Sequence, residues 1–385
     1  MAAGPRVAAE GGRGNRIRRR RGRVKGTSRD RGQGIGAYAG TIGGEERRMT
    51  RRALLQACLG GAGLMALSPL AVAAESPAAS APIVWRMPTE YPASTMPGEG
   101  LATFARRVAE RSGGALAVRP SFDAAAGLRS GAMIGAVEAG TVEAADAFTG
   151  PLAAVDPLFG LSSLPFLATS IEEARALAGI ARPAYARALA RHGQRLLYVT
   201  PWAPSGIWSR HALAGAADLQ GLRIRTYDAT SAAVLAAAGA RSVNLSQADA
   251  IPQVKAGAVD AMLSSGDGGV GRRLWEQLPH FLAVQYAMPI SIALVSGAAY
   301  DALPDTLRHA VDEAAAETEA RQWAAIRTRL DENFSRMRQN GVVIADPPPP
   351  EITGALARAG EAAVAAWVKD TGAEGERILA AYRGR

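Results

Sequence analysis

The fold is decided by residues 218–267, which read DLQGLRIRTYDATSAAVLAAAGARSVNLSQADAIPQVKAGAVDAMLSSGD. Gly221 and the alternating Leu222-Arg223-Ile224-Arg225 predict a turn that leads into a short strand. Asp228 to Ser231 supply cap-type residues before a first helical run, and Gly239 and Gly257 end the first and second runs. The pattern predicts alternating strands and helices over 222–225, 232–238, 243–245, 249–255 and 259–263.

This alternation predicts a parallel α/β unit. Sheets of this kind bind their ligands in the crevice beyond the carboxyl ends of the strands. Arg225 stands at the end of the first predicted strand, and residues 264–267 (Ser-Ser-Gly-Asp) follow the third. We therefore expect a binding site where these two strand ends meet.

Several short motifs lie along this stretch in a fixed order. Asp218 to Arg225 reads D-L-x-G-x-x-I-R, Gly239-Ala240 follows, and Ala256 to Asp260 reads A-G-x-V-D. Two segments outside it, Glu90-Tyr91-Pro92 and Ser163-Leu164-Pro165-Phe166-Leu167, complete the set. On these residues the chain resembles the substrate-binding proteins of tripartite ATP-independent periplasmic (TRAP) transporters of the DctP type, over nearly all of its length after about residue 82.

The resemblance implies a periplasmic-binding-protein-like α/β fold. It has two lobes, each with a mixed, mostly parallel sheet, joined by hinge strands and a long helix. We expect lobe I to comprise residues 82–202 and 291–330, and lobe II residues 203–290 and 331–385. The implied function is capture of an organic acid in the cleft between the lobes, for delivery to the small and large membrane subunits of a TRAP transporter.

The remaining sequence fits the same architecture. Strands over 83–87, 115–118 and 142–148 alternate with helices over 98–111 and 129–139, so the β-α-β-α-β pattern occurs twice. We predict a helical hairpin over 171–192 with Pro183 near its middle, strands over 282–288 and 290–296, a long helix over 301–340, and a last helix over 351–369.

Composition excludes several classes of function. The net charge of +9 belongs to the front end: residues 1–74 hold 15 of the 44 Lys and Arg and 4 of the 35 Asp and Glu, which leaves 29 and 31 for residues 75–385. The later part thus has no bulk signature of nucleic-acid binding. Its lack of Cys excludes a cysteine nucleophile or thiolate metal site, and its four scattered His residues predict no zinc site. We expect no cofactor and no catalytic residues.

Residues 1–48 are rich in Arg and Gly and have no hydrophobic period, so we predict that they are disordered. We interpret them as sequence upstream of the true start at Met49. The alternative is a nucleic-acid contact through Arg18-Arg19-Arg20-Arg21.

From Met49 the chain has the parts of an export signal. Residues 50–55 (Thr-Arg-Arg-Ala-Leu-Leu) resemble a twin-arginine motif, and an apolar run over 53–74 ends in Ala71-Val72-Ala73. We predict cleavage near Ala73 or Ala74 and a periplasmic protein. The alternatives are a retained membrane anchor and a lipoprotein attached through Cys58.

Arg225 is the main candidate for ligand binding. Its guanidinium offers two parallel N–H donors that match a carboxylate, and in the resembled family the arginine at this place grips the ligand carboxylate. The alternative is a surface arginine on an edge strand. Arg223 faces the other side of the same strand and serves as a control.

The loop and helix start that surround Arg225 supply further candidates. Asp228 either helps to fix the ligand or caps a helix. Ser264 aligns with a position where many relatives carry a ligand-contacting Asn, and Ser265 and Asp267 follow it. Asp267 either accepts a hydrogen bond from the ligand, helps to bind a bridging metal, or belongs to a Ser-Gly-Asp-Gly-Gly turn.

Residues on the side of the first lobe and hinge would line the rest of the cleft. Aromatic residues there bury the carbon skeleton of a ligand. Each could equally belong to the core. The candidates are Glu90, Tyr91, Phe148, Trp202 and Trp208.

Three departures from the family bear on the ligand. Trp208 stands where many relatives carry a second arginine, Gln247 where an aromatic residue is frequent, and Ser264 where Asn is frequent. Together they favour a small or apolar monocarboxylate over a dicarboxylate or sugar acid.

Three other functions are considered for such a fold, and the sequence disfavours two of them. An exported hydrolase would need a Gly-x-Ser-x-Gly nucleophile elbow, and residues 75–385 contain none. A dehydrogenase is disfavoured because no Gly-x-Gly-x-x-Gly follows the first strand of either unit. A ligand-sensing subunit of a membrane signalling system would share both fold and cleft, and stays open as an alternative.

Overall fold

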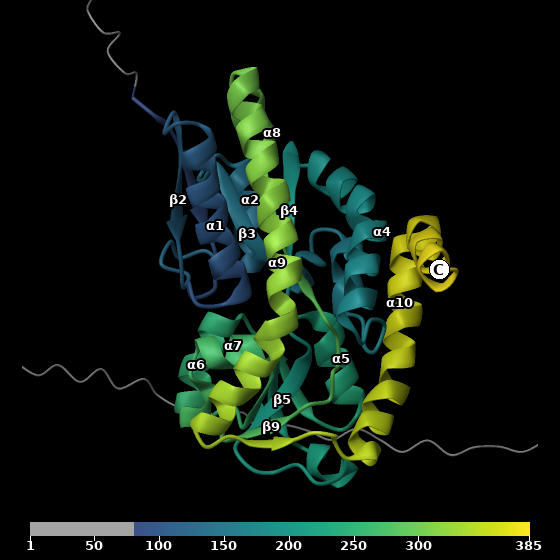
Figure 1. The fold of residues 1–385 in the computed structure, drawn as a ribbon. Coiled ribbons are helices and arrows are strands. Elements are labelled where there is room, and N and C mark those ends of the chain that lie inside the picture. The colour runs from purple at the N-terminus through teal and green to yellow at the C-terminus, as the bar shows by residue number, and fades with distance from the viewer. Residues whose placement is uncertain (1–80) are drawn as a thin grey trace, which may run out of the picture. The chain divides into compact units, whose positions relative to one another are not determined.

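The alternation of strands and helices read from the sequence is present in the computed structural model, which describes residues 81–385 (Figure 1). The predictions made for residues 1–74, namely disorder, the twin-arginine signal and its cleavage, lie outside the described residues. Within 81–385, none of the helices has the combined length and hydrophobicity that crossing a membrane requires.

The first lobe contains two small sheets. β1 (Ile83–Pro88) pairs in parallel with β2 (Leu116–Ser121). β10 (Ile290–Ser296) lies between β3 (Ala144–Phe148) and β4 (Gln194–Pro201) and is antiparallel to both. All five residues of β3 are buried, and its alanines contribute to apolar clusters on both faces of the sheet, so this strand forms the centre of the lobe.

The helices of the first lobe cover these sheets. They are α1 (Met96–Arg111), α2 (Met133–Glu138), α3 (Thr149–Leu152) and α4 (Ile171–Ala190). The predicted helical hairpin over 171–192 is wrong, because α4 is one helix that continues through Pro183. A proline inside a helix loses one backbone hydrogen bond. The buried apolar face of α4, which includes Leu177, Ala181 and Leu189, packs on the core and offsets that loss.

The second lobe is built on one six-stranded sheet of order β11-β9-β5-β8-β6-β7. Its strands are β5 (Ser205–Ser209), β6 (Arg223–Thr226), β7 (Arg241–Asn244), β8 (Ala261–Ser265), β9 (His280–Leu282) and β11 (Val343–Ala345). β6, β7 and β8 are mutually parallel, as the sequence predicts, whereas β5 runs antiparallel to its neighbours. The strand predicted over 282–288 is wrong: only Leu282 lies in a strand, as the last residue of β9, and residues 283–288 form none.

Three helices follow the parallel strands of this lobe: the first connects β6 to β7, the second connects β7 to β8, and the third comes after β8. They are α5 (Ala229–Ala237), α6 (Gln247–Lys255) and α7 (Gly266–Gly271). The sequence predicts a turn at Ser-Gly-Asp-Gly-Gly, but these residues begin the short helix α7, whose N-cap is Ser265. A Cβ on Gly269 would lie 2.2 Å from the ring of Trp208, so glycine is needed where α7 approaches β5.

Long helices connect the two lobes. After α8 (Gly297–Asp301), α9 (Asp305–Gln339) packs against α1 and β4 in the first lobe and α7 in the second (Figure 1). α10 (Pro350–Arg383) is interrupted at Gly372, where φ is 55° and ψ is −142°, so its first part agrees with the predicted helix over 351–369. It contacts the cores of both lobes. The predicted two-lobed α/β class with hinge strands and a long helix is confirmed, whereas the residue boundaries of the lobes stay a prediction.

Two glycines allow a direct test of this packing. A Cβ on Gly206 in β5 would lie 2.3 Å from the Phe281 ring and 2.6 Å from the Leu282 carbonyl oxygen. We expect Gly206→Ala to lower the free energy of unfolding by about 1–3 kcal/mol, because neighbouring strands cannot move apart freely. Urea unfolding followed by circular dichroism measures this change.

Gly179 in α4 is the matched control. It is exposed, and a Cβ there would meet nothing within 4 Å. Gly179→Ala should therefore raise the free energy of unfolding by about 0.5–1 kcal/mol, since alanine loses less backbone entropy in a helix. A neutral Gly206→Ala would contradict the packing described for β5 and β9.

Candidate functional site

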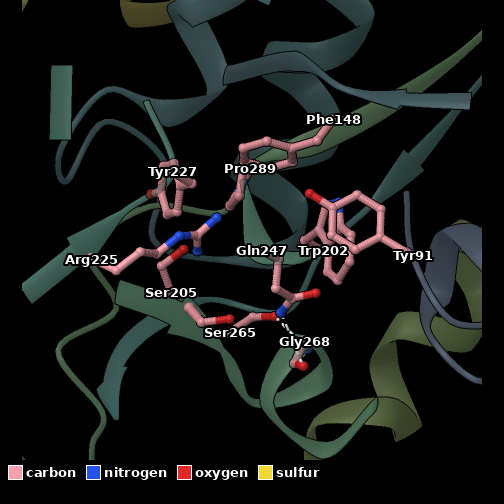
Figure 2. A pocket seen from close by; sticks show the side chains of 11 residues that line it. Tyr91, Phe148, Trp202, Ser205, Arg225, Tyr227, Gln247, Ser265, Gly268 and Pro289 are labelled. Carbon is pink, nitrogen blue, oxygen red and sulfur yellow. Dashed lines mark hydrogen bonds between the residues drawn. The ribbon is translucent and has the colours of Figure 1, made fainter. Parts of the chain in front are cut away.

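The carboxyl ends of β6 and β8 open onto a cavity of about 30 Å³ between the two lobes (Figure 2). Such a volume holds no more than a few water molecules. The side chains that line it come from both lobes. The lining residues are Tyr91, Phe148, Trp202, Ser205, Arg225, Tyr227, Gln247, Ser264, Ser265, Gly268 and Pro289.

Arg225 projects from β6 towards the middle of this cavity (Figure 2). Its side chain is 3% exposed; Nε donates to the Leu245 carbonyl oxygen at 2.8 Å and Nη1 to the Leu263 carbonyl oxygen at 3.2 Å. Within residues 81–385, no carboxylate forms an ion pair with it and Nη2 donates no hydrogen bond. Two backbone carbonyls thus fix the orientation of a buried cation that has no anionic partner among these residues.

Burial lowers the pKa of Arg225 from its ordinary value, and nearby Tyr91 and Glu90 oppose the shift. A guanidinium stays charged in proteins even so. The site therefore holds a full positive charge in a small volume from which most water is excluded. In such surroundings an anion is bound more strongly than at a surface.

An aromatic wall forms the opposite side of the cavity. Tyr91 and Trp202 pack edge to face with ring centroids 4.6 Å apart, and Phe148 packs against Trp202 at 6.2 Å and against Tyr227 at 5.2 Å. The Trp202 indole N–H donates to Ser291 Oγ at 3.0 Å, which fixes the ring. This wall presents rigid apolar surface to any molecule bound by Arg225.

Two buried polar side chains point into the site with unused hydrogen-bonding capacity. Gln247 Nε2 donates to the Gly268 carbonyl oxygen at 3.1 Å, whereas its Oε1 has no partner within residues 81–385 (Figure 2). The Tyr227 hydroxyl lies near Ser205 but makes no hydrogen bond of normal geometry in this part of the chain. A ligand with a polar group beside its carbon skeleton could satisfy these atoms.

The structure brings six of the ten predicted site residues together around the cavity. They are Arg225, Tyr91, Phe148, Trp202, Ser264 and Ser265. Sequence reasoning missed Ser205, Tyr227, Gly268 and Pro289 as lining residues and treated Gln247 only as a departure from the family. Tyr227 could have been found, because it stands two residues after Arg225 and so on the same face of the strand.

The three acidic residues among the predicted site residues do not line the cavity. Their carboxylates accept hydrogen bonds from N–H groups at the starts of helices. Asp228 is the N-cap of α5 and accepts hydrogen bonds from Ser231 N at 2.7 Å and Ser231 Oγ at 2.6 Å, the second of its two predicted roles. Burial raises the pKa of its carboxyl. Glu90 accepts from the Gln247 backbone N–H and Asp267 from the Met96 backbone N–H.

Trp208 lies in the core of the second lobe, away from the cavity. Its side chain is fully buried, its ring centroid is 5.0 Å from that of Phe281, and its indole N–H donates to the Ser265 carbonyl oxygen at 3.2 Å. It supports the strand that carries Ser264 and Ser265 from behind. Among residues 81–385, no group of three or more His, Cys, Asp or Glu side chains is placed to hold a metal ion.

The fold and the cavity together define a two-lobed binding protein that encloses a small molecule between its lobes. Residues 87–369 match the DctP family, described as bacterial extracellular solute-binding protein, family 7. Because this match extends over more than half of the sequence, the chain belongs to that family. The predicted resemblance is confirmed.

Individual relatives agree with this assignment. A solute-binding protein of Verminephrobacter eiseniae is 25% identical over 259 residues, which cover 65% of this chain and 75% of the relative. Two solved structures are extracytoplasmic solute receptors of Bordetella pertussis that bind pyroglutamic acid, and both have a TM-score of 0.75. DctP6 is 29% identical and covers 78% of this chain and 100% of its own; DctP7 is 31% identical and covers 78% and 99%.

A third solved structure is a marine metagenome TRAP solute-binding protein specific for pyroglutamate. It is 29% identical with a TM-score of 0.75 and covers 79% of this chain and 99% of its own.

The position of Trp208 leads to a prediction about stability. Trp208→Ala should lower the free energy of unfolding by about 3–5 kcal/mol, because it leaves a large cavity under β5 and α7 and removes a buried hydrogen bond. Urea unfolding measures this loss. The control is Val243→Ala at a side chain that is 39% exposed, where a change within about 0.5 kcal/mol is expected. A Trp208 variant as stable as the unaltered protein would contradict its placement in the core.

Proposed function

We propose that this protein captures a small organic monocarboxylate in the periplasm through an ion pair with Arg225, and delivers it to the two membrane subunits of a TRAP transporter. One observation carries the proposal: a buried guanidinium, held by two backbone carbonyls, that no carboxylate of residues 81–385 pairs with. A buried charge without a partner is strongly destabilising. A ligand carboxylate would remove this cost.

The charge inventory of the cavity supports a monocarboxylate. Among the lining residues, Arg225 carries the only formal charge, so a second carboxylate would be buried without a cation. No Asp or Glu lines the described cavity either, so the ammonium group of an ordinary amino acid would also be buried unpaired. The ligand that fits this inventory has one carboxylate and otherwise neutral atoms.

The neutral part of the cavity supports a compact ring with an amide. The aromatic wall suits the flat carbon skeleton, Gln247 Oε1 suits an N–H donor, and the Tyr227 hydroxyl suits a carbonyl acceptor. Pyroglutamate has these features, and three relatives of 29–31% identity bind it. We propose pyroglutamate as the ligand, which agrees with the small monocarboxylate expected from the sequence.

Entry of this ligand requires the lobes to separate. Arg225 is buried and both lobes contribute walls to the cavity around it, so a ligand would reach it as the lobes move apart. Closure that depends on the ligand would let the membrane subunits distinguish a loaded receptor from an empty one. Export by a twin-arginine signal, at residues 50–55, stays a prediction from the sequence.

Isothermal titration tests the ligand and the ion pair together. We expect L-pyroglutamate to bind with micromolar or tighter affinity, and succinate and L-proline to bind at least about a hundredfold more weakly because each would bury an unpaired charge. Arg225→Ala should weaken L-pyroglutamate binding by at least about a hundredfold, since it removes a desolvated charge pair. Tight binding that survives this substitution would refute the site.

Arg223→Ala is the matched control on the same strand. Arg223 lies two residues before Arg225 and therefore on the same face of β6, so the expectation that it faces the other side is wrong. It stands at the amino end of the strand, is exposed and pairs with Asp260 at 2.6 Å, so its loss should leave the affinity for L-pyroglutamate unchanged within about twofold. Delivery is tested by uptake: loss of this protein should abolish pyroglutamate transport in a host that retains the membrane subunits. Normal pyroglutamate uptake without it would contradict the transport role.

A further inference from the structure

Glu90 and Asp267 cross the cleft between the lobes in opposite directions. Asp267, in α7 of the second lobe, accepts a hydrogen bond through Oδ2 from the Met96 N–H, which begins α1 of the first lobe, at 2.8 Å. Glu90, which follows β1 of the first lobe, accepts through Oε1 from the Gln247 and Ala248 N–H groups, which begin α6 of the second lobe, at 2.9 and 3.4 Å. Both side chains are 1% exposed.

These hydrogen bonds satisfy helix N–H groups that the helices' own caps leave free. The N-cap residue of α1, Thr95, makes no side-chain capping hydrogen bond. The N-cap of α6, Ser246, accepts from the Asp249 N–H and leaves those of Gln247 and Ala248 to Glu90. The first N–H groups of a helix need such partners, and the helix dipole favours a carboxylate there.

We propose that these two carboxylates set the balance between the closed and the open form of the receptor. We call the pair, Glu90 and Asp267, the interlobe latch. Each lobe supplies the acceptor that caps a helix of the other, so both caps form only on closure. Glu90 and Asp267 act as positioning residues, not as ligand contacts. The link to affinity rests on the proposed function, whereas the latch itself concerns closure alone.

The latch is joined directly to the walls of the cavity. Gln247, whose N–H is bound by Glu90, lines the cavity with its side chain and donates to the Gly268 carbonyl oxygen. Gly268 also lines the cavity and follows Asp267 in α7. A ligand that orders Gln247 and Gly268 therefore orders the start of both helices, which gives a physical route from ligand to latch.

Other charged pairs cross the cleft at its rim. Arg129 pairs with Asp249 at 2.8 Å, and Arg272 pairs with Asp123. Arg129, Asp249 and Asp123 are each about one-third exposed or more, and ion pairs at such positions contribute little. The buried carboxylates, which lose all contact with water on closing, are the stronger determinants.

The charged surroundings of Asp267 give the latch a pH dependence. Its Oδ1 lies 3.5 Å from Arg329 Nη1, and Arg329 also contacts Glu99 and lies 3.8 Å from Glu332. Burial raises the pKa of Asp267 to about 6, despite the Met96 N–H and Arg329, which lower it. In an open form exposed to water the value would be near 3.9.

The direction of the pH dependence of closure follows from this difference in the pKa of Asp267 between the closed and open forms. The closed form binds a proton on Asp267 more tightly than the open form, so protonation favours closure. This contribution is fully present below about pH 4 and is lost as the pH rises through about 6. Asn at position 267 keeps an acceptor for the Met96 N–H but does not titrate. The substitution Asp267→Asn should therefore remove the dependence of closure on pH.

Electron paramagnetic resonance distances between spin labels test the latch without any ligand. Ala125 and Gln253 are exposed and lie on the first and second lobe, and Cys58 is the chain's one cysteine, so Ala125→Cys and Gln253→Cys are labelled uniquely in a Cys58→Ser chain. We expect Asp267→Ala and Glu90→Ala to reduce the closed population, and Asp267→Asn to keep it. Equal closed populations in all variants would overturn the latch.

Titration with L-pyroglutamate supplies the second readout. Asp267→Ala should weaken binding roughly 2- to 30-fold, as expected for loss of a helix cap, while Asp267→Asn restores it. Between pH 4 and 7 the affinity of the unaltered protein should fall relative to Asp267→Asn. If Asp267→Ala binds L-pyroglutamate as tightly as the unaltered protein does, the latch is refuted. If L-pyroglutamate does not bind the unaltered protein, the ligand assignment fails and the label distances still decide the latch.

Discussion

A single buried cation constrains the rest of this structure. Arg225 is placed at the end of β6, where backbone carbonyls of Leu245 and Leu263 hold it and no carboxylate of the described residues neutralises it. Keeping a charge in that position costs free energy, and the two backbone carbonyls that accept its hydrogen bonds offset part of that cost. The parallel strands β7 and β8 supply these carbonyls, because Leu245 directly follows β7 and Leu263 lies within β8.

The first lobe supplies the complementary surface. Tyr91, Phe148 and Trp202 form the aromatic wall that faces the cation, and they come from segments far apart in the chain. The wall removes water from around the guanidinium, which strengthens any ion pair formed there. The binding site exists only where the two lobes meet, so the free energy of lobe closure contributes directly to the free energy of ligand binding. The hydrogen bonds of Glu90 and Asp267 to helix ends across the cleft contribute to the free energy of closure.

Sequence reasoning located the cation correctly but assigned some neighbours by family position alone. Trp208 stands where relatives carry an arginine, yet its strand register turns it into the core beside Phe281. Glu90 and Asp267 lie in the expected segments, but their carboxylates turn to the backbone of the opposite lobe. Such choices depend on which helix ends lie nearby after closure, and a linear pattern does not contain that information.

The sequence by itself determined what depends on local order along the chain. The two runs of alternating strands and helices and the arginine at a strand end follow from periodicity and from residue types at fixed offsets. Only the tertiary structure decided that Gln247 and Tyr227 keep unused polar atoms beside Arg225, and that each lobe caps a helix of the other. The reason is physical: burial and hydrogen-bond partnership between distant segments arise from how the lobes pack, and packing is a property of the whole chain.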